Sequence, residues 1–113
     1  MQLQVVQTKA DARTFLEVPV ELYQNDPLWV RPWDHDIEQV FDPQKNKLFR
    51  SGDCRRWILK SKDNKLIGRV AAFYQKNAKD AVGGMGFFEC INDTKASTML
   101  FNAAKQWLAD RDI

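Results

Sequence analysis

The first residues of the chain show two different spacings of apolar side chains. Leu3 and Val5 alternate with polar residues, as in a short half-buried strand. From Ala12 onward the spacing becomes three and four residues, which is typical of one helical face, and Thr8 offers a side-chain oxygen that can cap the helix. The face consists of Phe15, Leu16, Pro19, Leu22 and Tyr23. Because proline lacks an N–H group, we expect Pro19 to bend or interrupt this helix.

A loop rich in large apolar side chains follows. The sequence Asn-Asp-Pro at 25–27 is typical of a turn that stops a helix. The apolar residues of the loop are Leu28, Trp29, Val30 and Trp33. Such a cluster would form a sticky patch if exposed, so we expect it to pack over a groove or an edge of the core.

A second, short helix is predicted next. Pro32 suits its first turn, and Asp42-Pro43 ends it. Its apolar face would consist of Trp33, Ile37, Val40 and Phe41. The polar stretches 44–47 and 51–53 are predicted to be loops that lead to the sheet.

The clearest strand pattern lies in the middle of the chain. Residues 56–61 and 66–74 are rich in apolar, β-branched and aromatic side chains, and the polar turn 62–65 joins them, which predicts a hairpin. A polar crossing at 75–81 and three glycines precede the apolar run 87–91, which is typical of a central strand.

The final segment has the most regular helical spacing. Its apolar stripe consists of Ala96, Met99, Leu100, Ala103, Ala104, Trp107 and Leu108. Asp93 or Thr94 can cap the helix, which runs close to the last residue. The predicted fold is therefore α/β (α+β), with the order β-α-α-β-β-β-α and a mixed, mainly antiparallel sheet.

Composition adds limits to this fold. A length of 113 residues suits one domain, 1–113, and 44% apolar with 28% charged residues suits a globular core. The net charge of +2 is spread along the chain and demands no polyanion as partner. Cys54 and Cys90 lack paired spacing, which indicates free thiols in a reducing compartment. Without a leader-like start or a long apolar stretch, we expect a cytoplasmic protein with no membrane partner.

Two groups of residues carry a resemblance to a known superfamily. The hairpin Trp57-Ile58-Leu59-Lys60 with Gly68-Arg69-Val70 in its returning strand is similar to the second and third strands of the acyl-CoA N-acyltransferases, the GNAT superfamily. The segment 22–32 (LYQNDPLWVRP) together with 86–90 (GFFEC) resembles a bacterial group of GNAT-like proteins. The resemblance covers nearly the whole chain, as the N-terminal half of that fold, and places Ile113 where the next strand would begin. Because the absence of that strand would leave the central strand with an unpaired edge, we expect a homodimer through this edge.

The resemblance also implies an activity and its residues. The superfamily transfers an acyl group from acetyl-CoA or another acyl-CoA to an amine, here an unidentified small molecule or peptide. In the superfamily, the turn after the fourth strand binds the cofactor pyrophosphate, and the strand before it pairs with pantetheine. The implied cofactor contacts are Phe88, Cys90, Ile91, Asn92, Thr94, Lys95, Ala96 and Ser97. Glu89 lies where some members keep a general base, and a backbone N–H within 89–91 would stabilise the oxyanion.

Structural explanations for the same residues leave other functions open. The turn has no glycine, and Asp93 puts a negative charge where a diphosphate would bind. Capping alone explains Asp93, Thr94 and Ser97. Glu89 can be a solvated carboxylate or one paired with a neighbouring arginine, and Cys90 can be a core thiol. A non-catalytic GNAT-fold binding or structural module that has lost the cofactor is therefore the main alternative.

A nucleic-acid-binding module is a weaker alternative, and a metal site has little support. The cations that would form a basic surface near Trp57 are Lys45, Lys47, Arg50, Arg55 and Arg56. His35 is the single histidine, flanked by Asp34 and Asp36, and no other ligands have metal-site spacing. We therefore predict a surface histidine and no metal.

Overall fold

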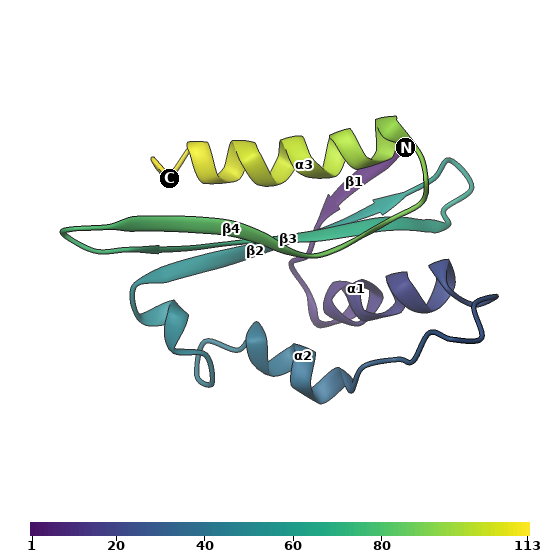
Figure 1. Ribbon diagram of the computed structural model, residues 1–113, viewed down its shortest axis with the longest axis horizontal. Coiled ribbons are helices and arrows are strands. Elements are labelled where there is room, and N and C mark those ends of the chain that lie inside the picture. The colour runs from purple at the N-terminus through teal and green to yellow at the C-terminus, as the bar shows by residue number, and fades with distance from the viewer.

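The computed structural model describes residues 1–113 as a sheet covered by helices on both faces. The strands are β1 (Gln2–Val5), β2 (Gly52–Lys60), β3 (Leu66–Lys76) and β4 (Ala81–Cys90), in the order β1-β2-β3-β4. Helix α3 (Thr94–Ala109) covers one face, and α1 (Lys9–Leu22) with α2 (Asp34–Val40) lies on the other (Figure 1). The α+β class and the predicted element order are confirmed, although every strand pair is antiparallel and the sheet is not mixed.

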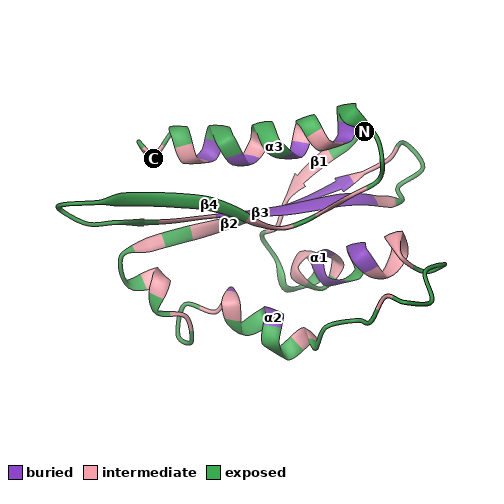
Figure 2. Ribbon diagram, viewed as in Figure 1, coloured by how far each residue is buried: buried purple, intermediate pink, exposed green.

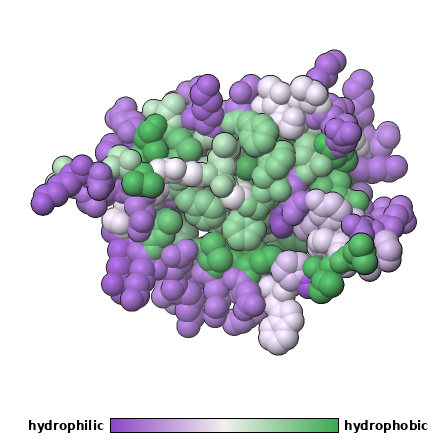
Figure 3. Space-filling view, in the orientation of Figure 1, coloured by the Kyte–Doolittle hydropathy of each residue, from purple (hydrophilic) through white to green (hydrophobic).

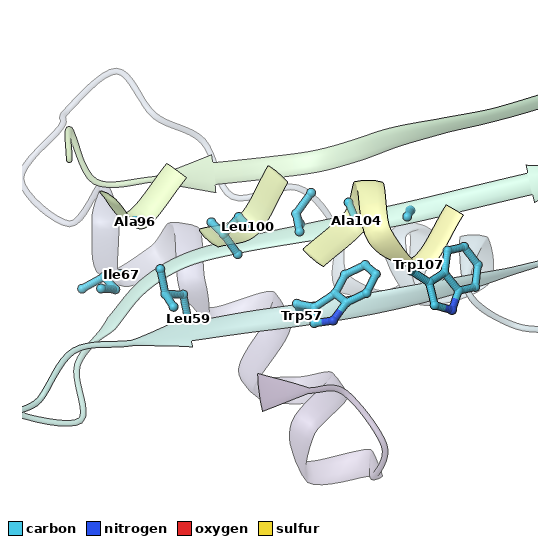
Figure 4. Packing of buried hydrophobic residues seen from close by; sticks show 9 residues of the cluster. Trp57, Leu59, Ile67, Ala96, Leu100, Ala104 and Trp107 are labelled. Carbon is cyan, nitrogen blue, oxygen red and sulfur yellow. The ribbon is translucent and has the colours of Figure 1, made fainter. Parts of the chain in front are cut away.

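Each face of the sheet has its own apolar core. Alternation along β2 sends Trp57 and Leu59 toward α3 and the intervening Ile58 toward α1. Figure 4 shows the first core, in which Leu100 and Trp107 of α3 pack on the strands. Burial is concentrated in the middle strands and in the facing sides of the helices, whereas β4 is exposed over most of its length (Figure 2).

Helix α1 runs through its proline. Thr8 caps it as predicted, and Asp11 completes a capping box by accepting from the Thr8 N–H. Proline has no N–H to donate to the carbonyl of Phe15 four residues earlier, and this carbonyl instead accepts a hydrogen bond from Arg69 Nη1 at 2.8 Å. The predicted interruption at Pro19 is therefore wrong, because a side chain from the sheet satisfies the carbonyl that proline leaves unpaired.

The loop between α1 and α2 differs from its prediction. Only Trp29 packs, against the ring of Tyr23, at a centroid distance of 5.6 Å. Leu28, Val30 and Trp33 are 89%, 82% and 77% exposed. Trp33 precedes α2 and does not belong to its buried face, which uses Ile37 and Phe41 as predicted.

Three strands are longer than the sequence pattern predicted, and β3 continues past residue 74 to Lys76. β2 includes Gly52 and Asp53, where a loop was predicted, and a Cβ at Gly52 would lie 1.7 Å from the carbonyl oxygen of Tyr74. β4 includes Gly83, Gly84 and Gly86, which pair with β3. β4 is an edge strand and not the predicted central one, because β3 is its single neighbour. A further short 3-10 helix, η1 (Lys47–Arg50), replaces part of a predicted loop.

Candidate functional site

A bulge in β4 positions the candidate base. Opposite the single residue Val70 of β3 lie two residues of β4, Phe87 and Phe88, between the pairs Arg69↔Glu89 and Ala71↔Gly86. Phe87 has a positive φ of 54°, which is uncommon for a residue with a side chain. The extra residue turns Phe87 toward the core that α1 covers, where it packs near Phe15, Phe41 and Phe73.

Glu89 is half-buried beside this bulge and is held by a tyrosine from α1. The Tyr23 hydroxyl donates a hydrogen bond to Glu89 Oε2. This hydrogen bond to the carboxylate, together with burial, raises the pKa of Tyr23 to about 12, so the phenol keeps its proton at neutral pH. One carboxylate oxygen is thus fixed, and Oε1 has no hydrogen bond to another protein group.

A buried arginine lies directly across the strand pair from Glu89. Arg69 is 4% exposed, and its guanidinium lies over the ring of Phe15 at 4.7 Å from the centroid. Burial lowers its pKa, and the charge of Glu89 opposes that shift. No Arg69–Glu89 contact is within salt-bridge distance, so the arginine contributes a positive potential near the carboxylate and leaves Oε1 without a protein partner.

The turn from β4 into α3 uses its backbone donors internally. Asp93 caps α3, and its Oδ1 accepts from the amides of Lys95 at 2.8 Å and Ala96 at 3.2 Å. Ser97 donates its side-chain hydroxyl to the Thr94 carbonyl. These are the groups that would bind an acyl-CoA diphosphate, and a carboxylate already occupies two of the donors and repels a second anion. The turn therefore does not fit the diphosphate group.

The other predicted cofactor residues do gather around one surface. An open hollow is lined by Phe88, Cys90, Ile91, Asn92, Asp93, Thr94 and Ser97. Phe88 stacks on Phe101 of α3 with centroids 4.5 Å apart, which gives the hollow an apolar wall. Lys95 and Ala96 are not part of the lining. Ala96 is fully buried where α3 packs on the sheet.

Backbone geometry decides which N–H group within 89–91 could stabilise the oxyanion. The Ile91 amide donates to the carbonyl of Ile67 at 2.9 Å and is not available. Successive N–H groups of an edge strand point alternately toward and away from its neighbour, which directs the Cys90 amide outward. Among the backbone amides predicted to stabilise the oxyanion, that of Cys90 therefore points away from β3 and is available as a donor.

The remaining candidate groups do not form a site. Burial raises the pKa of the Cys90 thiol and raises that of Cys54 to about 11, as expected of unreactive thiols. His35 is exposed, and no cluster of metal-ligating side chains is present. Arg55 lies near Trp107 on the α3 face, whereas Arg56 lies over Phe41 on the opposite face. The predicted basic cluster is thus divided between the two faces of the sheet.

Sequence reasoning missed Tyr23 and Arg69 as parts of the site. Tyr23 is 66 residues from Glu89, and no local pattern joins them. A signal for Arg69 was present, since it is a charged residue inside the apolar run 66–73 that the structure buries.

Comparison with known proteins yields two curated relatives. The chain is 24% identical over 111 residues to a bacterial ceramide synthase of Caulobacter vibrioides, covering 94% of this chain and 29% of that protein. It is 29% identical over 105 residues to protein YghO of Escherichia coli, covering 88% of this chain and 26% of that protein. The chain therefore spans between a quarter and a third of the length of these relatives. No protein-family model matches it, and no solved structure matches it.

Proposed function

We propose that the chain contributes the base and the acceptor-amine side of a GNAT-type N-acyltransferase. The observation that carries the proposal is the carboxylate of Glu89, held by Tyr23 next to a strand bulge on the α1 face of β4, with Oε1 left without a protein partner. The similarity to a protein called ceramide synthase supports it, because a ceramide is the amide of a fatty acid and a long-chain amine.

The proposed reaction needs one proton acceptor. Glu89 Oε1 takes a proton from the substrate ammonium, directly or through a water molecule. The freed amine nitrogen then attacks the carbonyl carbon of the activated acyl group, a C–N bond forms, and the bond from that carbon to the leaving group breaks. The leaving group departs with the bonding electron pair, and the second proton that the nitrogen loses passes to the leaving group or to solvent. The outward N–H of Cys90 is the proposed donor to the carbonyl oxygen while it carries negative charge.

A non-catalytic binding module of the same fold is the second candidate. The observation that favours it is Asp93, whose carboxylate takes the amide donors at the β4–α3 turn. Calorimetric titration with acetyl-CoA separates the two candidates. Saturable heat at millimolar concentration favours the enzyme, and none from the folded chain favours the module.

The decisive assay for the enzyme is amide formation. The chain is incubated with sphinganine and either acetyl-CoA or palmitoyl-CoA, and the amide is measured by mass spectrometry. We expect Glu89→Gln to lower the rate by about 10²- to 10⁴-fold, the usual contribution of a general base. Glu38→Gln, an exposed carboxylate on α2, is the matched control and should leave the rate unchanged. Equal rates for wild type and Glu89→Gln, or no amide from the folded wild type, would contradict the proposal.

A further inference from the structure

The loop between α1 and α2 presents an apolar surface that no other part of the chain covers. Leu28, Val30 and Trp33 are all more than three-quarters exposed and lie within six residues of one another. Figure 3 shows apolar side chains at the lower right margin of the molecule, where Figure 1 places this loop. We call the three residues the apolar tip.

Polar contacts hold the loop in the conformation that exposes the apolar tip. Arg31 bridges Glu17 of α1 at 2.9 Å and Asp34 of α2 at 3.0 Å. Asp26 accepts from the Leu28 amide at 2.9 Å, which fixes the turn before the tip. Two prolines, Pro27 and Pro32, further restrict the backbone. The polar groups of the loop therefore hold it to the helices, and its apolar groups point into solvent.

The loop is continuous with the candidate site. Trp29, between Leu28 and Val30, packs on the ring of Tyr23, and Tyr23 donates to Glu89. A molecule bound at the apolar tip is thus separated from the proposed base by two side chains. The chemistry expected at such a position is that of an amphiphile, with an apolar part at the tip and a polar group near Glu89.

We infer that the apolar tip docks the protein on a lipid bilayer surface, from which a long-chain amine reaches Glu89. Three side chains give too small an area for a stable protein interface, which needs about 800 Å² on each partner. They suffice for shallow insertion, and tryptophan favours the interface between membrane and water. No helix of the chain is long and apolar enough to span a membrane, so the contact is peripheral. This inference differs from the expectation of no membrane partner.

The charges around the tip define the kind of lipid. Glu17, Asp26 and Asp34 provide three negative charges, and Arg31, already paired with two of them, provides one positive charge. Such a surface is not attracted to anionic headgroups. Binding should therefore depend on apolar insertion, occur on phosphatidylcholine and vary little with salt.

Vesicle flotation of the chain tests the inference. We expect the wild type to float with phosphatidylcholine vesicles at millimolar lipid, with no gain from added phosphatidylserine. Leu28→Asp/Val30→Asp should weaken partitioning by at least about tenfold, since burial of one such side chain contributes about an order of magnitude. Val82→Asp/Met85→Asp is the matched control, because it places the same charges on exposed apolar positions of β4. Circular dichroism verifies that both variants fold.

Three results would overturn the inference. They are an unbound wild type, equal binding of wild type and loop variant, and binding that appears only with phosphatidylserine and disappears with salt. The inference rests on the proposed function for the identity of the amphiphile, but flotation requires no acyl donor or acceptor. Glu89→Gln should float like wild type while losing amide formation, so failure of one claim is distinguishable from failure of the other.

Discussion

Pro19 and Arg69 each leave a buried polar group in need of a partner, and one hydrogen bond serves both needs. A proline inside a helix leaves a carbonyl without its donor, and a buried arginine requires acceptors. The hydrogen bond from Arg69 Nη1 to the Phe15 carbonyl satisfies the first need and part of the second. The Nε of Arg69 has no partner. The rest of the guanidinium is stabilised by the rings of Phe15 and Phe87. This arrangement places a fixed positive charge behind Glu89.

Tyr23 gives the site a pH dependence at alkaline pH. Its pKa is raised from 10.0 to about 12 in the folded chain by the hydrogen bond to Glu89. The corresponding stabilisation is therefore complete below pH 10 and is lost as the pH rises through about 12. Ultraviolet absorbance of tyrosinate measures this titration. We expect Tyr23→Phe to remove the component that titrates near pH 12, and an unchanged titration curve would contradict the assignment.

At the scale of elements, helix α3 depends on Asp93, which also occupies the amide donors at its N-terminus. Asp93→Ala removes the cap from Lys95 and Ala96, and we expect the free energy of unfolding in urea to fall by about 1 kcal/mol. The same change frees two amides and removes a negative charge, so calorimetry should show tighter binding of coenzyme A than in wild type. Asp63→Ala, in the β2–β3 turn, is the control for lost charge alone. Equal coenzyme A binding by wild type and Asp93→Ala would show that Asp93 does not block the site.

The elements were predictable to the extent that their signals are local. Thr8, the hairpin and the stripe of α3 follow from capping, β-propensity and helical spacing. The first half of β4 was missed because Gly83 and Gly84 carry no strand propensity, and pairing with β3 holds them in the sheet. The apolar tip was misjudged because apolarity predicts burial only where another element is available to cover the residue.

The site was less predictable than the fold. Glu89 was predicted through resemblance to a superfamily, and its role stays a prediction. Tyr23, which holds it, comes from α1, and Arg69, which lies across the strand pair, comes from β3. Their approach depends on the register of β3 with β4 and on a bulge whose position no periodicity reveals. In contrast, the sequence alone showed that the turn before α3 has no glycine and offers Asp93 as a cap. The structure confirms that Asp93 caps α3.

Over the whole molecule, β4 is the strand with the longest free edge for hydrogen bonding to another strand. It is a long edge strand with Val82, Met85 and Phe88 exposed. β1, the other edge, has only four residues. The expectation of an open edge is thus confirmed for this chain, and a homodimer through it stays a prediction. The proposed site lies between this edge and the apolar tip, so a lipid amine and an acyl donor would approach from different sides.

The central claim is that Glu89 faces a substrate amine, and carboxyl ¹³C NMR of glutamate-labelled protein tests it most directly. Octylamine is titrated into the folded chain, with the Glu89 resonance assigned by its absence in Glu89→Gln. We predict that this resonance shifts saturably while that of Glu38 does not move. A Glu89 resonance that stays constant, or a uniform shift of all glutamates, would contradict the account.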